Sequence, residues 1–177
     1  MSPITVVAID DDSSILRLTG RAFGPRYCPN VSEVATFLEA PRNSKVEALV
    51  NKVRDALAAG HRVVVITDGT MPNDTTPLII TEALQTEGLL VTRAALEAWI
   101  ADADMERPTG APVVLSTGGI GDTNLQRRVD AALKEGTLVG VLLKGSDLAT
   151  LRGLVLALAM AERDQLRDAL KRLPQTA

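Results

Sequence analysis

Five short stretches of the chain are apolar and rich in β-branched residues, which is the pattern of strands buried on both faces of a sheet. Four of them are predicted as strands: residues 4–9, 62–67, 113–116 and 138–143. The fifth, residues 34–38, fits either a short strand or part of a helix, and the strand is favoured.

Between these stretches, apolar residues recur at helical spacing. Helices are predicted over residues 13–23, 44–57 and 124–134, as two segments between residues 78 and 104 broken near Gly88, and from Asp147 as far as Leu173. Ser44 and Glu47 have the spacing of a capping box at the start of the second helix. Asp12 or Ser13 and Asp122 are expected as N-caps of their helices.

Strands that alternate with helices predict an α/β fold, a parallel sheet with helices on both faces. The helical pattern between residues 78 and 104 is then an additional helical insertion before the fourth strand. The chain shows no internal repeat, low-complexity tract or linker, so residues 1–177 are expected to form one domain.

Composition narrows the functional classes. Hydrophobic residues make up 46% of the chain but aromatic residues only 2%, so the core must be aliphatic. A net charge of -3 argues against non-specific nucleic-acid binding through a basic surface. The longest apolar run, residues 154–161, is far too short to span a membrane, and the start does not have the pattern of a signal peptide. The single Cys28 fits a reducing compartment, so a cytoplasmic protein is expected.

Charged residues follow three of the predicted strands. Asp10 and Asp11 follow the first, Asp68 the third and Lys144 the last. Ligands of open parallel sheets bind at the carboxyl ends of the strands, so these side chains are expected to meet in one crevice. Three carboxylates suit Mg²⁺ better than zinc, and an ammonium suits a phosphoryl group.

Residues near the fourth strand extend this phosphate chemistry. Thr117 can donate its hydroxyl to a phosphate oxygen, and Gly118 and Gly119 leave room for an anion at the backbone. Carboxylates form aspartyl phosphates, so Asp68 is a candidate nucleophile for phosphoryl transfer.

This set of residues resembles the receiver (CheY-like) domain of two-component response regulators over the whole length of the chain. The matching segments are Asp10-Asp11, residues 68–72 with the sequence Asp-Gly-Thr-Met-Pro, residues 112–118, and residues 141–144, which end at Lys144. Asp68 followed by Met71-Pro72 is the most specific part of the resemblance.

The resemblance implies a flavodoxin-like, doubly wound five-stranded sheet in the order 2-1-3-4-5. It implies transfer of a phosphoryl group to Asp68 from a histidine kinase or a histidine phosphotransfer protein, a self-catalysed step rather than turnover of an external substrate. By the same resemblance, Asp11, Asp68 and the backbone carbonyl of Thr70 would hold Mg²⁺, with Asp10 assisting through a metal-bound water. Thr117 and Lys144 would contact the phosphoryl group.

The chain departs from the family pattern at several positions. Val141 stands where a switch aromatic is expected, Gly145 replaces the usual proline, and residues 73–75 replace the usual acidic-glycine turn. The segments from Asp11 to Asp68 and from Pro72 to Pro112 are also longer than is typical. These differences leave the phosphoacceptor residues in place and concern how a signal would leave the site.

Two alternative functions stay open on the sequence. One is a haloacid-dehalogenase-like phosphatase with Asp10 as nucleophile, since residues 10–12 contain an Asp-x-Asp motif. The other is a receiver-fold interaction module that is not phosphorylated.

The output is expected to pass through another protein, through self-association or through a further domain, because no DNA-binding segment follows the last strand. The final predicted helix would be about 40 Å long if it reached Leu173. Its end could then contact a second copy in a homodimer, whereas the plainer interpretation assigns its apolar stripe to the core.

Overall fold

The computed structural model describes residues 2–144, 148–160 and 162–173. Its sheet contains β1 (Ile4–Asp10), β2 (Val31–Leu38), β3 (Arg62–Asp68), β4 (Val113–Thr117) and β5 (Gly140–Leu143). All neighbouring strands are parallel, and their order is β2-β1-β3-β4-β5. The predicted fold class and strand order are confirmed, and the ambiguous residues 34–38 lie in a strand.

The central strands are buried on both faces. Every residue of β1 is buried, and so is β3 after its first residue. Successive side chains of a strand point to opposite faces, so Val64 and Ile66 of β3 belong to one hydrophobic cluster and Val63 and Val65 to the other. This double burial explains why these strands are continuous apolar runs in the sequence.

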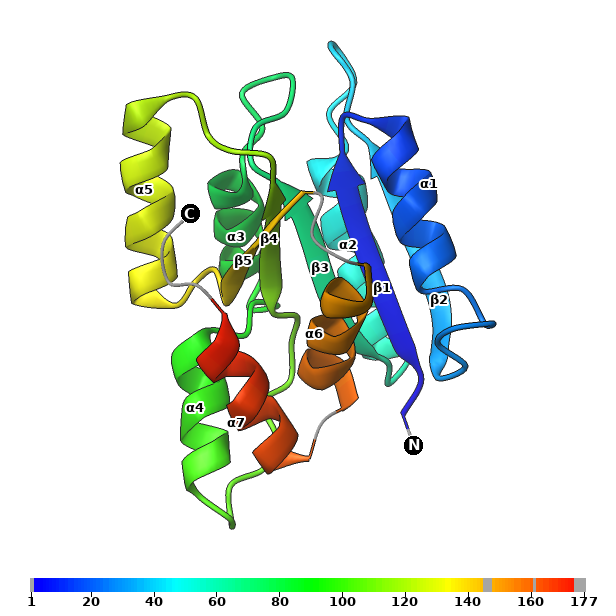
Figure 1. Ribbon diagram of the computed structural model, residues 1–177, viewed down its shortest axis with the longest axis vertical. Helices are drawn as coiled ribbons and strands as arrows, with labels where there is room; N and C mark the ends of the chain where they lie inside the picture. The colour runs from blue at the N-terminus through cyan, green and yellow to red at the C-terminus, as the bar shows by residue number, and fades with distance from the viewer. Residues whose placement is uncertain (1, 145–147, 161, 174–177) are drawn as a thin grey trace.

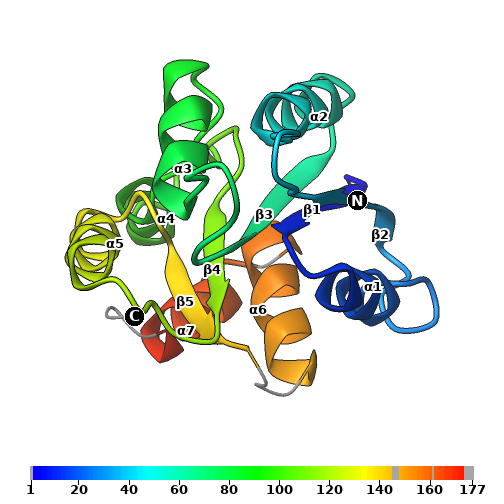
Figure 2. The same ribbon diagram turned by 90° about the horizontal axis from the view of Figure 1, so that it is seen from above.

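Helices cover both faces of the sheet (Figures 1 and 2). One face carries α1 (Ser13–Ala22) and α6 (Leu148–Met160). The other carries α2 (Val46–Ala58), α3 (Pro77–Thr86) and α5 (Thr123–Glu135). None of the described helices is long and apolar enough to cross a membrane.

Two further helices, α4 (Arg93–Ala101) and α7 (Arg163–Arg172), lie side by side below the amino-terminal ends of β4 and β5 (Figure 1). Arg93 joins them, because its guanidinium donates to the carbonyl of Leu170 in α7 at 2.8 Å and to that of Val139 at 3.3 Å. The two helical segments predicted between residues 78 and 104 are α3 and α4, and the packing partner of α4 comes from the end of the chain.

The prediction of one long final helix is wrong. α6 ends at Met160 and α7 begins at Arg163, and α7 packs against both α6 and α4. The apolar stripe of α6 belongs to the core, since Val155 and Leu158 are fully buried. The projecting helix end on which the expected homodimer contact depended does not form. Gly145 and the predicted helix start at Asp147 lie outside the described residues.

The predicted capping box is also wrong. α2 begins at Val46, and its N-cap residue Lys45 makes no side-chain capping bond. The backbone N–H of Lys45 instead donates to the Glu39 carboxylate at 2.7 Å. A buried carboxylate at the preceding strand end thus accepts from an N–H group directly before α2.

Candidate functional site

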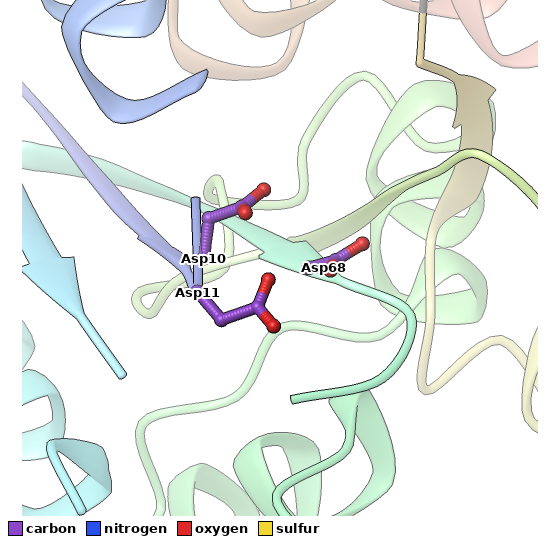
Figure 3. Close-up of side chains that lie close together, drawn as sticks. All are labelled: Asp10, Asp11 and Asp68. Carbon is purple, nitrogen blue, oxygen red and sulfur yellow. The ribbon is translucent and has the colours of Figure 1, made fainter. Parts of the chain in front are cut away.

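The predicted acidic residues meet at the carboxyl ends of β1 and β3 (Figure 3). Asp10 is the last residue of β1 and Asp68 the last of β3, while Asp11 follows β1 directly. One oxygen from each carboxylate lies within 4.8 Å of the other two. Asp10 and Asp68 are buried, whereas Asp11 is exposed, so the group opens to solvent on the side of Asp11.

Lys144 completes this group. Its Nζ lies 2.9 Å from Oδ2 of Asp10 and 2.9 Å from Oδ1 of Asp68. The lysine is brought there because its backbone N–H donates to the Thr117 carbonyl at 2.7 Å, which continues the β4–β5 pairing one residue beyond β5. The structure therefore brings together four of the predicted site residues from three strand ends.

Backbone donors hold the two buried carboxylates. Oδ1 of Asp10 accepts from the N–H of Asp12 at 2.8 Å, and Oδ1 of Asp68 accepts from the N–H of Gly69 at 2.6 Å. The ion pair of Asp68 with Lys144 also falls on Oδ1. Both carboxylates are fixed in orientation before any ligand binds.

Burial and hydrogen bonds to charged neighbours shift the pKa values of Asp10 and Lys144 in opposite directions. Burial raises the pKa of Asp10, although hydrogen bonds from Lys144 and from the Asp12 backbone partly oppose it. Burial also acts to lower the pKa of Lys144, but its hydrogen bonds to Asp10 and Asp68 outweigh that effect and the net pKa is raised. Lys144 is therefore a fixed positive charge at neutral pH.

Thr117 lies beside the residue that follows Asp68. It is the last residue of β4, is buried, and its Oγ1 accepts from the N–H of Gly119 at 3.1 Å. A methyl group at residue 69 would lie only 2.6 Å from this oxygen, so the close approach requires Gly69. Thr117 therefore ends β4 beside the turn that follows Asp68.

The turn after β3 carries Thr70 and the Met-Pro pair. Thr70 is exposed, whereas Met71 is buried and its N–H donates to the Thr75 carbonyl at 3.1 Å. Asn73 and Asp74 have positive φ angles of 62° and 54°. This tight left-handed turn takes the place of the acidic-glycine turn that the family pattern would have supplied.

Glu39 is a functional candidate that the sequence reasoning missed. It follows β2, is 1% exposed, and its carboxylate accepts from Thr75 Oγ1 at 2.9 Å, Asn73 Nδ2 at 3.2 Å and the Lys45 N–H. Its own N–H donates to the Asp10 carbonyl at 3.1 Å. Glu39 thus ties the turn after Asp68 to the strand that carries Asp10. The only signal for Glu39 in the sequence was its place directly after residues 34–38, and the assignment of those residues to a strand was itself uncertain.

Val141, at the position of the expected switch aromatic, is buried inside β5. Ile120 lies near Gly69, with its Cγ1 3.5 Å from where a Cβ of residue 69 would stand. The apolar side chain next to the Asp68 turn therefore comes from the loop after β4.

Comparison with solved structures identifies the architecture. The RcsB response regulator of Salmonella typhimurium matches 97% of this chain, with a TM-score of 0.56 and 16% identity, and the match covers 67% of the RcsB chain. The signal receiver domain of an HD domain-containing protein from Pseudomonas fluorescens Pf-5 matches 97% of this chain and 100% of its own, with a TM-score of 0.53 and 17% identity.

The chain has a receiver fold. No protein-family model and no curated protein matches the sequence. Within this receiver fold, the acidic group and Lys144 lie at the carboxyl edge of the sheet, the edge at which ligands bind in open α/β folds.

Proposed function

We propose that this chain is a phosphoacceptor receiver domain of a two-component phosphorelay, in which Asp68 takes a phosphoryl group from a phosphohistidine donor. The observation that carries the proposal is the joint placement of Asp68, two further carboxylates within 4.8 Å, and Lys144 at 2.9 Å. Such a site offers a nucleophile, oxygen ligands for a cation and a fixed positive charge for the transferred group.

The donor set fits Mg²⁺. It consists of hard carboxylate oxygens without nitrogen or sulfur ligands, and three like charges this close favour a neutralising cation. In this proposal Asp11, Asp68 and the Thr70 carbonyl hold the ion and Asp10 supports it through water. When bound, the ion supplies neutralisation of negative charge at Asp68 and the incoming phosphoryl group.

In the transfer step, a carboxylate oxygen of Asp68 attacks the phosphorus of the phosphohistidine. The new O–P bond forms as the P–N bond breaks, and its electron pair returns to the imidazole nitrogen of the donor. Oδ2 is the suitable oxygen, since the Lys144 and Gly69 contacts both fall on Oδ1. Lys144 and the Thr117 hydroxyl then bind oxygens of the transferred group.

The partner proposed is a histidine kinase or a histidine phosphotransfer protein in the cytoplasm, acting on a single receiver domain over residues 1–177. The RcsB structure was described in connection with DNA interaction. Here the net charge of -3 leads us to propose output without direct nucleic-acid binding.

The phosphatase alternative is not favoured. It requires Asp10 as nucleophile, but Oδ2 of Asp10 pairs with Lys144 and Oδ1 accepts from the Asp12 backbone. Asp10 is thus held by both oxygens, as expected of a supporting carboxylate. The Lys144 ion pairs fit a receiver-fold module that is not phosphorylated equally well, so labelling of Asp68 distinguishes the two functions.

The deciding experiment is labelling with acetyl phosphate in the presence of Mg²⁺, followed by mass spectrometric mapping of the modified residue. Wild type should carry one phosphoryl group on Asp68, and Asp68→Asn should carry none. Asp55→Asn, an exposed aspartate of α2, is the matched control and should be labelled normally. A phosphoryl group on Asp10, or a labelled Asp68→Asn protein, would refute the assignment, and absence of any label would favour the unphosphorylated module.

A further inference from the structure

An exposed tyrosine with two arginines over its ring lies where the loop between α1 and β2 meets α6. The guanidinium carbon of Arg152, in α6, lies 4.8 Å from the centroid of the Tyr27 ring, and that of Arg26 lies 5.5 Å from the same centroid. Tyr27 is 54% exposed, Arg26 is exposed and Arg152 is half-buried. All three residues therefore retain surface that is open to solvent.

The two guanidinium groups have unused hydrogen-bond donors. Within the part of the chain that the structure describes, neither Arg26 nor Arg152 forms a hydrogen bond or an ion pair, and their contacts with the Tyr27 ring leave the N–H groups unpaired. A guanidinium that rests on an aromatic ring still presents these groups in its own plane, as a fork that matches a carboxylate. Two like charges held near one ring also repel each other, and a bound anion relieves that repulsion.

Hydrogen bonds within the loop fix the position of Tyr27. The backbone N–H groups of Tyr27 and Cys28 donate to the carbonyl of Gly24, at 2.9 and 3.0 Å. Cys28 is only 1% exposed, and its Sγ donates to the carbonyl of Ala22 at 3.6 Å. The aromatic ring is thus held in place before any partner binds, which lowers the entropic cost of binding.

A largely apolar groove adjoins the tyrosine, between the loop and α6. It has a volume of about 330 Å³, and its walls include Pro29, Leu156 and Ala157. Gly153, which directly follows Arg152, also lines the groove, and no atom lies within 4 Å of where its Cβ would stand. No aspartate or glutamate is found among the described residues that line the groove. An apolar side chain can therefore enter it next to the arginines.

From this arrangement we infer that Arg26, Tyr27, Arg152 and the adjoining groove form a docking surface for an acidic segment of a partner protein. A carboxylate of that segment binds the guanidinium groups, and a neighbouring apolar side chain enters the groove. Charge complementarity selects this occupant, and the net charge of -3 on the whole chain disfavours nucleic acid.

The docking surface is separate from the candidate phosphoacceptor. The loop precedes β2, so it lies at the amino-terminal edge of the parallel sheet, whereas Asp68 lies at the carboxyl edge (Figure 1). The proposed phosphoryl transfer uses none of the residues of the docking surface. Binding of the acidic segment therefore does not require that Asp68 is phosphorylated.

The direct test is selection of short peptides from a displayed random library on the immobilised full chain, followed by fluorescence anisotropy of the labelled peptides. The selected peptides should carry aspartate or glutamate next to leucine, isoleucine or valine. The double variant Arg26→Gln, Arg152→Gln should bind them roughly tenfold or more weakly than wild type. Their affinity for wild type should also fall as the salt concentration is raised, because both arginines are accessible to solvent.

Two further pairs of variants separate this surface from a general effect of charge. Arg127→Gln, Arg128→Gln makes the same change of charge at exposed positions of α5, on the other face of the sheet, and should leave peptide binding unchanged. Gly153→Glu brings a carboxylate into the groove while both arginines stay, and the uncharged Gly153→Gln matches it in size. Gly153→Glu should therefore weaken binding severalfold more than Gly153→Gln does.

The inference is overturned if the selection yields only peptides without acidic residues, or if the double variant at Arg26 and Arg152 binds the selected peptides as tightly as wild type. It is also overturned if a labelled single-stranded oligonucleotide binds more tightly than the peptides. A dimer that light scattering detects in wild type but not in this double variant would assign the surface to a second copy instead. Labelling of Asp68 by acetyl phosphate should be the same in wild type and in the double variant, so the two proposals can fail separately.

Discussion

At the scale of single residues, the two ends of the parallel strands carry opposite charge. Asp10, Asp11 and Asp68 gather at the carboxyl edge with one lysine, whereas Arg62 and Arg107 line a cavity at the amino-terminal edge. Each buried charge is held by backbone groups as well as by side chains, so the orientation of each depends on where a strand or helix ends.

Replacing Glu39 tests whether the orientation of the charged side chains at the carboxyl edge depends on how the strand ends are held. Glu39→Ala removes an acceptor for Thr75, Asn73 and the Lys45 N–H in a buried position, and is expected to lower the free energy of unfolding by about 2–4 kcal/mol. Because the Asp68 turn would lose its tie to β2, the rate of labelling by acetyl phosphate should fall as well. Urea denaturation and a labelling time course measure the two effects.

The matched control is Glu33→Ala in β2, the strand that Glu39 follows. Glu33 pairs with Lys52 at 2.6 Å, but its side chain is 42% exposed, and such surface pairs contribute about 0–1 kcal/mol. If Glu39→Ala were no more destabilising than Glu33→Ala, and labelled as fast as wild type, Glu39 would have no positioning role.

At the scale of elements, the N-termini of α5 and α2 show one capping interaction that the sequence predicts correctly and one that a tertiary contact replaces. Asp122 caps α5 as expected, since its Oδ1 accepts from the Leu125 N–H at 2.7 Å. Ser44 has the right spacing for the start of α2, but its Oγ lies 3.4 Å from the Val46 nitrogen and the Lys45 N–H turns to Glu39. A local motif was displaced here by a buried carboxylate six residues earlier in the chain.

Replacing each capping candidate by alanine measures this difference. Asp122→Ala should destabilise the protein by about 1 kcal/mol, because an orphan N–H of the first turn of α5 loses its acceptor. Ser44→Ala should change stability by no more than a few tenths of a kcal/mol, because it makes no short capping bond. Chemical denaturation of the two variants measures both losses of stability. An equal loss in both would mean that Ser44 does cap α2.

How much of the fold and the site could be predicted from the sequence likewise depends on whether the deciding contacts are local or distant along the chain. β1, β3 and β4 were predictable because double burial makes them apolar throughout, and the strand ends then placed Asp10, Asp68 and Lys144 at one edge. The break between α6 and α7 was not predictable, because apolar spacing continues through it and tertiary contacts with α4 and α6 stabilise the second helix in its place. Glu39 was missed because its side-chain partners Asn73 and Thr75 lie 34 and 36 residues away.

At the scale of the whole molecule, the α4–α7 layer adds a second unit to the receiver fold (Figure 1). Leu166 and Leu170 of α7 are buried, and Leu173 covers Gly140 so closely that a Cβ there would lie 2.7 Å from its Cδ1. The layer contacts α6 through α7 and reaches β5 through Leu173 at Gly140, whereas β1 and β3 lie in the centre of the sheet. Elements with fewer buried contacts open locally at a lower free energy than the well-packed core does.

Hydrogen exchange should therefore resolve two cooperative units. Amides of α4 and α7 are expected to exchange together, through an opening of lower free energy than the global unfolding that exposes β1 and β3. Arg93→Ala removes the bonds from α4 to the carbonyls of Leu170 and Val139, so it should accelerate exchange in α4 and α7 severalfold and leave β1 unchanged. Arg54→Ala, which breaks only the exposed contacts with Glu87 and Asn51, is the control and should affect neither unit. Equal acceleration in β1 and α7 by Arg93→Ala would mean that the layer and the sheet unfold as one.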